Sequence, residues 1–295
     1  MAVIQSFDPW KGRLCTCPLK YSLSPYTGCA HACRYCYITA YIPNAFHCRV
    51  KQDFIKRLQL DLKRIIPERH ISIANSADPY SPPEGELELT RKALQILLGG
   101  GFKVQLITKS DLVVRDLDII RKGNCSVSIS ITTIDDKVAQ RLEPGAPSPK
   151  RRLDAIRRLV MAGVPCTIRV DPIIPSINDE KLEEIVKKVS QAGASHLVAS
   201  TYKAKRDSFN RLVNTFPEFK ETLNELYWVS GEQVGRARYL PKALRLDLLR
   251  NLKNLAEDFG MTYAVCREGM SELRSGQTCD GSHLIPNRRQ PSKIL

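Results

Sequence analysis

The chain has 295 residues, 43% of them hydrophobic and 26% charged, a composition typical of a globular protein and one that excludes long disordered segments. Its net charge of +14 favours a polyanion such as DNA or RNA as a partner, although a generally solvated cationic surface would carry the same charge. No stretch approaches the roughly 18 consecutive apolar residues of a membrane helix, and no signal-peptide core opens the chain, so we expect a cytoplasmic protein without membrane contact.

Short β-branched runs alternate with longer amphipathic runs along the first two thirds of the chain. A first strand is expected around residues 21–26 and a first helix around residues 51–65. The later strands are predicted at 71–75, 103–108, 126–132, 166–174 and 196–200, and the later helices at 88–100, 148–163 and 178–193. Repeated alternation of strand and helix implies right-handed crossovers and a parallel sheet.

The ends of two helices are marked by capping residues. Ser148 precedes a proline at the first helical position, and Asn178 is expected to cap the helix that follows it. Beyond residue 200 the pattern is mainly helical, clearest at 245–260, with a short strand at 262–266.

The predicted fold is therefore α/β. Residues 1–200 are expected to form a partial (β/α)6 barrel with an N-terminal extension, and residues 201–295 a helical C-terminal extension packed on the barrel. No linker rich in Pro, Gly or Ser marks the boundary near residue 200.

Three cysteines, Cys29, Cys33 and Cys36, lie close together in one predicted loop. Four cysteines complete an ordinary cubane iron–sulfur cluster, and four Cys or His side chains complete a zinc site, so three thiolates leave one metal position open. Gly28 allows the backbone to wrap a metal closely. His31, inside the loop, would close the open position if it were a ligand, so we expect it to hydrogen-bond or to be exposed instead.

The spacing Cys29-x3-Cys33-x2-Cys36 after the first barrel strand resembles the signature of the radical S-adenosylmethionine (SAM) enzymes. The resemblance implies that the three cysteines hold a [4Fe-4S] cluster whose fourth iron is chelated by SAM. It also implies reductive cleavage of SAM to a 5′-deoxyadenosyl radical, which abstracts hydrogen from a substrate, and a reductant such as ferredoxin or flavodoxin. A structural zinc site or a simple ferredoxin-type site is the alternative.

Longer stretches resemble one branch of that family, the spore photoproduct lyase-like proteins, described broadly as DNA repair photolyase homologues. These stretches are residues 21–38, 76–91, 107–120, 128–136, 142–156 and 171–179. The resemblance therefore extends over most of the predicted barrel and is not confined to three cysteines.

This resemblance implies SAM-binding roles for three residues at or just beyond strand ends. Tyr35 would lie beside the adenine, Lys109 near the carboxylate or ribose of SAM, and Ser130 on the ribose. A lysine can neutralise a carboxylate, and a serine hydroxyl suits a sugar hydroxyl. The alternatives are a solvated loop lysine and a strand serine that faces a helix.

Three further candidates follow or end predicted strands. Asp78 and Tyr80 come after the second strand and are candidate catalytic residues, although Asp78 could instead only cap a turn. Asp171 is a candidate cofactor-binding residue on the same side of its strand as Arg169. An internal ion pair with Arg169 is the alternative for Asp171.

The sequence also departs from the resemblance. Spore photoproduct lyases carry a cysteine, the hydrogen donor to the product radical, where this chain has Asn75 or Ser76. Neither side chain can donate a hydrogen atom as a thiol does. Repair of spore photoproduct itself is therefore not expected, and a different radical reaction is.

Four other cysteines flank the predicted barrel: Cys15, Cys17, Cys266 and Cys279. If the two ends of the chain meet, these thiols predict a second iron–sulfur cluster or a zinc site. The alternative is a set of unrelated free thiols, one of which replaces the missing hydrogen donor.

We predict a radical SAM enzyme, lyase-like or modifying, that acts on nucleic acid or on a nucleotide-derived substrate. Basic runs at 150–159 and 202–211 agree with DNA or RNA as partner, although an ordinary solvated face looks the same. The alternatives are a radical enzyme acting on a peptide or small molecule, and an iron–sulfur protein that handles clusters or transfers electrons.

Overall fold

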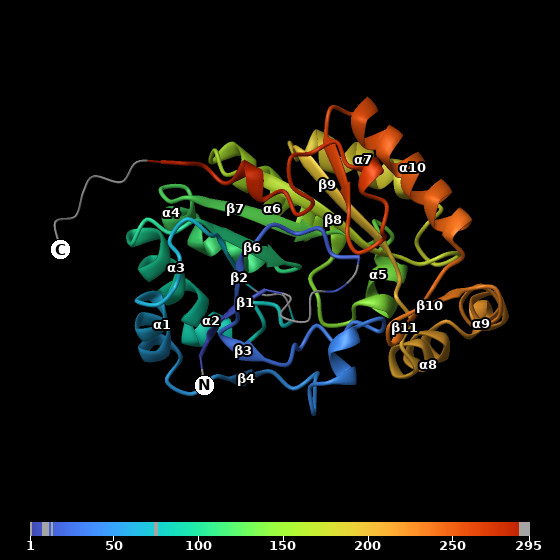
Figure 1. The fold of residues 1–295 in the computed structure, drawn as a ribbon, viewed down its shortest axis with the longest axis horizontal. Helices are drawn as coiled ribbons and strands as arrows, with labels where there is room; N and C mark the ends of the chain where they lie inside the picture. The colour runs from blue at the N-terminus through green and yellow to red at the C-terminus, as the bar shows by residue number, and fades with distance from the viewer. Residues whose placement is uncertain (1, 8–11, 13, 74–75, 289–295) are drawn as a thin grey trace.

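A single eight-stranded sheet forms the centre of the protein, which is described here from a computed structural model covering residues 2–7, 12, 14–73 and 76–288 (Figure 1). The strands are, in spatial order, β1 (Ile4–Ser6), β2 (Tyr21–Leu23), β5 (Ile71–Ile73), β6 (Val104–Thr108), β7 (Cys125–Ser130), β8 (Cys166–Ile173), β9 (His196–Thr201) and β12 (Thr262–Val265). From β2 to β12 all neighbours pair in parallel, while β1 pairs antiparallel with β2. The parallel α/β fold predicted from the sequence is confirmed.

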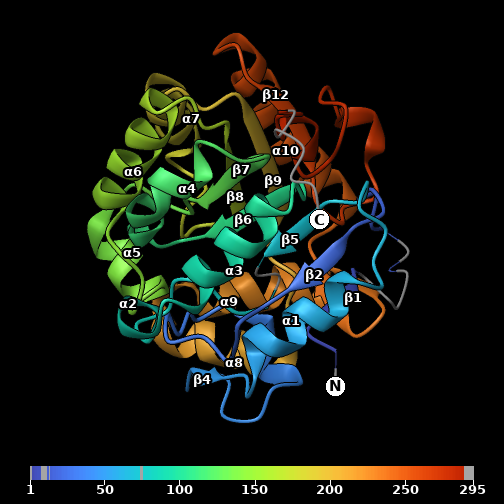
Figure 2. The same ribbon diagram turned by 90° about the vertical axis from the view of Figure 1, so that its left-hand side faces the viewer.

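Helices connect successive strands and cover one side of the sheet (Figure 2). They are α1 (Phe54–Leu62), α2 (Glu84–Leu87), α3 (Leu89–Gly99), α4 (Leu117–Ile120), α5 (Asp136–Leu142), α6 (Pro149–Met161), α7 (Leu182–Gln191) and α10 (Lys242–Asp258). Their apolar faces and the outward strand residues form the main hydrophobic core. Within the described part of the chain, no helix is both long and apolar enough to span a membrane.

One predicted helix start is wrong. Ser148 caps α6 as expected, but α7 begins at Leu182 rather than just after Asn178. The Asn178 amide is used elsewhere: it accepts from the backbone N–H of Ile174 at 2.6 Å and donates to the carbonyl of Thr132 at 2.8 Å. These bonds connect the segment after β8 to the loop after β7. Because the Asn178 side chain is used in them, it does not cap α7.

The C-terminal third is more than a helical extension of the barrel. Its first part, α8 (Arg206–Thr215), α9 (Lys220–Asn224), β10 (Glu232–Val234) and β11 (Ala237–Tyr239), has its own apolar cluster (Figure 1). The chain then returns through α10 to β12, which pairs in parallel with β9. The sheet therefore contains seven parallel strands, one more than six β/α units supply, and a boundary at residue 200 would divide it.

The opposite, concave side of the sheet carries polar residues and is covered by the C-terminal segment. Gln105, near the start of β6, donates to the carbonyl of Asp280 at 2.6 Å. A Cβ on Gly281 would lie 2.5 Å from the side chain of Thr167, near the start of β8, so this segment packs closely at the amino-terminal ends of the strands. The carboxyl ends, where the loops of barrel enzymes build their sites, are left to the cysteine loop and its neighbours.

Candidate functional site

The cysteine loop follows β3 (Tyr26–Thr27) and is held tightly by the chain that comes after it. The backbone N–H of Cys29 donates to the carbonyl of Ala45 at 2.8 Å. Gly28 has a φ of +79°, and a Cβ there would lie 2.3 Å from the carbonyl oxygen of His47. Only glycine therefore fits this position, as the close wrapping predicted for the loop requires.

A second segment, residues 142–145, fixes the other side of the loop. The N–H of Arg34 donates to the carbonyl of Leu142 at 2.9 Å, and the N–H of Gly145 donates to the carbonyl of His31 at 3.0 Å. A Cβ on Gly145 would lie 2.2 Å from the carbonyl oxygen of Ala30, so this approach also depends on glycine. The loop is thus clamped by backbone hydrogen bonds from both sides.

The imidazole inside the loop is turned toward a carboxylate. The Nδ1 atom of His31 lies 3.5 Å from Oδ2 of Asp78, and both side chains are buried. Burial raises the pKa of the Cys29 thiol, but the hydrogen bond and charge of His31 outweigh it, and that pKa is lowered overall. The imidazole of His31 is therefore engaged by Asp78 and Cys29.

Asp78 joins the loop to the ends of two strands. Its carboxylate accepts from Thr108 Oγ1 at 2.7 Å, from the N–H of Lys109 at 2.7 Å and from the N–H of Tyr80 at 2.9 Å. Asp78 therefore caps the turn, as the alternative interpretation proposed. It also contacts the carboxyl end of β6 and His31 of the cysteine loop.

The donor set suits a cluster with three protein ligands. Cys33 is buried and Cys29 and Cys36 are half-buried, so the three thiols line one shielded loop. In the described chain, no three His, Cys, Asp or Glu side chains stand around a common point as ligands of a single ion. When bound, a [4Fe-4S] cluster held this way retains one iron for an exchangeable ligand.

A buried carboxylate beside the loop gathers several donors. Glu143 accepts from the hydroxyl of Tyr35 and from Thr132 Oγ1 at 2.9 Å, and it pairs with Arg152 Nη1 at 2.6 Å and with Lys109 Nζ at 3.8 Å. We call these five residues the loop network. Burial raises the pKa of Glu143, but the charges of Arg152 and Lys109 outweigh it and lower the pKa to about 2.

The loop network is not closed on itself. Arg152 Nη2 is buried without a hydrogen-bond partner among the described residues, whereas Nη1 of the same guanidinium lies 2.6 Å from Glu143 Oε2. The ammonium of Lys109 lies 5.7 Å from the centre of the Tyr35 ring. Burial lowers the pKa of Lys109, but the Glu143 carboxylate outweighs it and raises that pKa, so two cations face one carboxylate at neutral pH. Within the five residues of the loop network, positive charge therefore exceeds negative charge by one, and the Asp78 carboxylate nearby also acts on Lys109.

Two further predicted residues lie on neighbouring strands, at different distances from this network. Ser130 ends β7, is buried, and its carbonyl accepts from Arg152 Nη1 at 3.1 Å, which places it beside the loop network. Asp171 pairs instead with Arg169 at 2.6 Å and accepts from Ser200 at 2.8 Å. The internal ion pair considered for Asp171 is therefore present.

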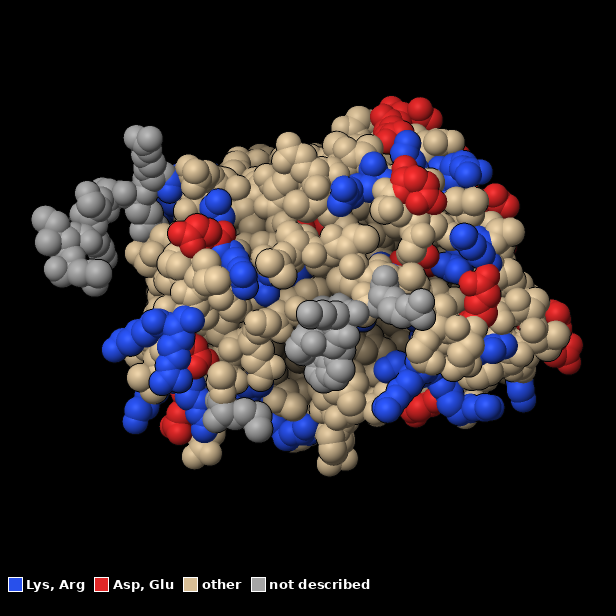
Figure 3. Space-filling model, viewed as in Figure 1, with Lys and Arg blue, Asp and Glu red and all other residues tan. Residues whose placement is uncertain are grey.

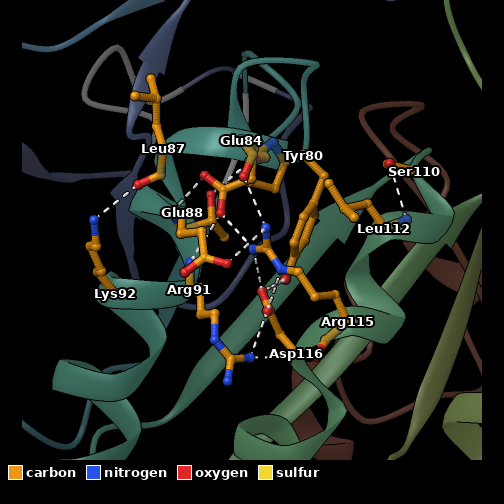
Figure 4. A network of polar contacts seen from close by, with 12 residues as sticks. Tyr80, Glu84, Leu87, Glu88, Arg91, Lys92, Ser110, Leu112, Arg115 and Asp116 are labelled. Carbon is orange, nitrogen blue, oxygen red and sulfur yellow. Dashed lines mark hydrogen bonds and ion pairs between the residues drawn. The ribbon is translucent and has the colours of Figure 1, made fainter.

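Tyr80 belongs to a separate set of charged side chains (Figure 4). Its hydroxyl donates to Asp116 Oδ2 at 3.0 Å, and the Arg115 guanidinium bridges Asp116 and Glu84. Arg91 donates to the other oxygen of Asp116 at 3.0 Å. We call these five residues the turn network. Tyr80 is buried in it, and its hydroxyl is used there rather than at the cysteine loop.

Of the two positions that replace the expected thiol, Asn75 lies outside the described residues. Ser76 is half-buried and hydrogen-bonds to Tyr41, which brings the turn after β5 close to the helix after the cysteine loop.

Sequence reasoning missed three residues that hold this site. Glu143 and Arg152 fall in a stretch that resembles the family but were not singled out. Arg211, on α8, donates to the carbonyls of Arg34 and Cys36 at 3.1 and 2.9 Å. No sequence signal links Arg211 to a loop 175 positions earlier.

Aromatic and basic side chains meet where the loop runs into η1 (Tyr37–Ala40). Tyr37 and Tyr41 are 46% and 55% exposed, with ring centres 6.0 Å apart, and Lys205 Nζ lies 6.0 Å from each ring. Burial, and then the charges of Arg236 and Arg267, lower the pKa of Lys205. We call these five residues the rim cluster. Lys and Arg also gather at the lower right of Figure 3, where Figure 1 places α8 and the hairpin β10–β11.

Comparison with known sequences places this site in a family context. The model of the Radical SAM superfamily matches residues 23–189. An uncharacterised protein of Mycobacterium tuberculosis is 30% identical over 257 residues, covering 79% of this chain and 72% of that protein. A radical SAM Nα-GlyT isomerase of Pseudomonas phage M6 is 22% identical over 257 residues, covering 83% of this chain and 53% of that protein.

The fold is also similar to that of solved structures. Spore photoproduct lyase with bound AdoMet and dinucleoside spore photoproduct superposes with a TM-score of 0.65 at 19% identity, covering 83% of this chain and 75% of that one. At this level of identity the likeness concerns the fold.

Proposed function

This chain belongs to the radical SAM superfamily, and we propose that it uses SAM-derived radical chemistry on a nucleic acid or nucleotide-derived substrate. A [4Fe-4S] cluster held by Cys29, Cys33 and Cys36 would supply the electron for reductive cleavage of SAM. A low-potential donor such as ferredoxin or flavodoxin would deliver that electron. The reaction on the substrate is lyase-like or modifying, and repair of spore photoproduct is not proposed because Asn75 or Ser76 stands where the resemblance places the donor thiol.

The residues of the cysteine loop and of the loop network have different proposed roles. Cys29, Cys33 and Cys36 hold the cluster. Lys109 binds the carboxylate or ribose of SAM, and Tyr35 lies by the adenine. What supports these roles is the surplus positive charge of the loop network, because the carboxylate of SAM can accept from donors that the protein leaves unused.

Ser130 and Asp78 complete the assignment around SAM. Ser130 would reach the ribose from the end of β7, next to Arg152. Asp78 orients His31 and the backbone of Lys109, so it acts on the cluster loop and on SAM through these partners. Tyr80 and Asp171 are proposed as positioning residues, since both are engaged by charged neighbours.

The rim cluster carries the proposal for the substrate. Exposed tyrosine rings can stack on bases, and a group of cations beside them can hold phosphates. The rim cluster begins at Tyr37, the residue after Cys36, so a bound strand would pass directly over the cluster loop. Among similar proteins, spore photoproduct lyase has been solved with a dinucleoside spore photoproduct, which agrees with this substrate class.

The cluster assignment is tested by anaerobic reconstitution with iron and sulfide, followed by SAM and dithionite. We expect the wild type to form 5′-deoxyadenosine. A wild type that holds a full cluster and forms none would contradict the assignment.

The substrate class is tested by binding of labelled single-stranded DNA and RNA across a series of KCl concentrations. Replacing both Lys205 and Arg236 with alanine should weaken binding about tenfold or more and lower the salt slope by about 1.4, since each phosphate contact on a single strand contributes about 0.7. The matched control replaces Lys188 and Lys253, which lie on α7 and α10 and remove the same charge. Equal losses in both variants, or binding without salt dependence, would favour a peptide or small-molecule substrate.

A further inference from the structure

A second group of cysteines comes together far from the cluster loop in sequence. The Sγ atoms of Cys17 and Cys279 lie 3.5 Å apart, although 262 positions separate them. Cys15 is hydrogen-bonded to Cys17, and Cys266 lies close enough to Cys279 to affect the pKa of that thiol. The sequence predicted a second metal site on the condition that the two ends of the chain meet. In the structure this condition holds for Cys15, Cys17 and Cys279.

Neither segment that brings these thiols together is a helix or a strand around its cysteines. A buried ion pair holds them instead: Lys20 Nζ lies 2.6 Å from Asp280 Oδ2, and both side chains are at most 4% exposed. Gln105 binds the backbone of Asp280 as well. The thiols of Cys17 and Cys279 are thus positioned by anchors on either side of them, and not by the regular sheet.

The sulfur separation fits tetrahedral coordination of one ion. A zinc–sulfur bond of about 2.3 Å places two thiolates of a tetrahedral site about 3.8 Å apart. The observed 3.5 Å between Cys17 and Cys279 is close to that value. A disulfide requires about 2.05 Å, and ligands of a cubane cluster bind different irons and stand further apart.

Cations near the four cysteines would offset part of the charge of such a site. Zinc with four thiolates carries a net charge of −2, and buried charge of this size needs compensating groups. Lys20, Arg267 and Arg169 act on Cys17, Cys15 and Cys266, respectively. Two of these cations, Lys20 and Arg169, are also paired with the carboxylates of Asp280 and Asp171.

We propose that Cys15, Cys17, Cys266 and Cys279 form a closed, thiolate-ligated zinc site. It is independent of the cluster loop and of the reaction proposed above. In the described chain no three such side chains are yet set around one point, so the ion draws Cys15 and Cys266 toward the pair of Cys17 and Cys279. With four protein ligands the site has no open position, and its role is structural.

The proposed zinc site would join the N-terminal segment to the segment that follows β12. Leu14 and Thr16 line a small cavity together with Val265, Gly269 and Cys279, so these two segments already pack together. β1 and β12 are the two edge strands of the sheet and do not pair with each other. The zinc would link the two chain segments next to these edges. The two cysteine groups thus contrast: three ligands with an open position at the loop, and four without one here.

The experiment counts zinc by mass spectrometry in a chain whose loop cysteines, Cys29, Cys33 and Cys36, are replaced with alanine. We expect about one zinc per chain, and after cobalt exchange the absorption bands of tetrahedral thiolate ligation. Adding Cys17→Ser and Cys279→Ser should reduce zinc to background. Adding Cys125→Ala and Cys166→Ala, which remove two buried thiols from strands, should not.

Several results would overturn this inference. They are a loop variant without zinc, zinc that persists after Cys17→Ser and Cys279→Ser, iron and sulfide in place of zinc, and two thiols missing from a titration of the denatured chain, which indicates a disulfide. If the serine variant does not fold, alkylation of the wild type decides the question. Zinc must then protect Cys17 and Cys279 from iodoacetamide while leaving Cys48 as reactive as before, and equal rates with and without zinc exclude the site.

Discussion

The loop network and the turn network are built from the same kinds of side chain, yet they differ in whether every buried polar atom has a hydrogen-bond partner. In the turn network both oxygens of Glu84 and both oxygens of Asp116 accept hydrogen bonds, from Arg115, Arg91, Tyr80 and nearby groups (Figure 4). In the loop network, Arg152 Nη2 is buried and lacks a hydrogen-bond partner among the described residues.

This difference separates a structural role from a binding role. Buried charges are costly unless they are paired and hydrogen-bonded, so a closed network such as the turn network stabilises the fold without needing a ligand. Unused donors in a buried network call for an explanation, and a bound anion is one. The loop network lies beside the cysteine loop and carries surplus positive charge, which suits the carboxylate of SAM.

The largest expected effect concerns the cysteine loop and leaves the rest of the fold unchanged. Cys33→Ala should abolish 5′-deoxyadenosine formation, because one cluster ligand is lost, while thermal unfolding changes little. Cys125→Ala is the matched control, since that thiol is buried on β7 to a similar degree. Chromatography of the anaerobic reaction measures the product. A Cys33→Ala variant that forms as much product as the wild type contradicts the cluster assignment.

The next effect tests the turn network. Glu84→Gln removes one of the two buried carboxylates that Arg115 bridges and should lower the free energy of unfolding by about 3 kcal/mol, as measured by denaturant titration. SAM cleavage per bound cluster should be unchanged. Glu143→Gln should lower both stability and SAM cleavage. If Glu84→Gln impairs SAM cleavage as much as Glu143→Gln does, the two networks do not have separate roles.

Lowering the pH should weaken the loop network by protonating Glu143. Its pKa is about 2 in the folded chain against an ordinary 4.5, so the carboxylate stabilises the fold fully above about pH 4.5 and loses this effect as the pH falls toward 2. The stability advantage of the wild type over Glu143→Gln should shrink by about 3 kcal/mol across that window. Denaturant titrations at several pH values measure it, and an advantage that stays constant contradicts this electrostatic role.

The sequence predicted the barrel and the cysteine loop because both depend on local patterns. Strand and helix periods place Lys109 and Ser130 at strand ends, and a loop of three cysteines needs no distant partner to be recognised. The sequence did not reveal that β12 joins the sheet, since a four-residue strand looks the same whether it pairs with β9 or stands alone.

Residues that act through long-range contacts were beyond sequence reasoning. The position of Arg211 beside the loop depends on how α8 packs, which its own sequence does not encode. Tyr80 looked equivalent to Asp78 because both follow β5. Their side chains nevertheless reach different networks, since Asp78 contacts His31 whereas Tyr80 contacts Asp116. Spacing along the chain gives the position of a residue, and only packing gives its partner.

The smallest effect we predict concerns the cation shared between Glu143 and the proposed SAM site. Lys109→Met keeps the length of the side chain but removes its charge, while Arg152 still neutralises Glu143, so stability should change little. The KM for SAM should rise about 10- to 100-fold, as expected for one lost charge-assisted contact worth about 1.5–3 kcal/mol, with a smaller change in kcat. Lys92→Met is the control at the turn network, where the ammonium only donates to a backbone carbonyl. If both variants shift KM equally, or neither does, the surplus charge of the loop network is not what binds SAM, and the unused donors of Arg152 become the better candidate.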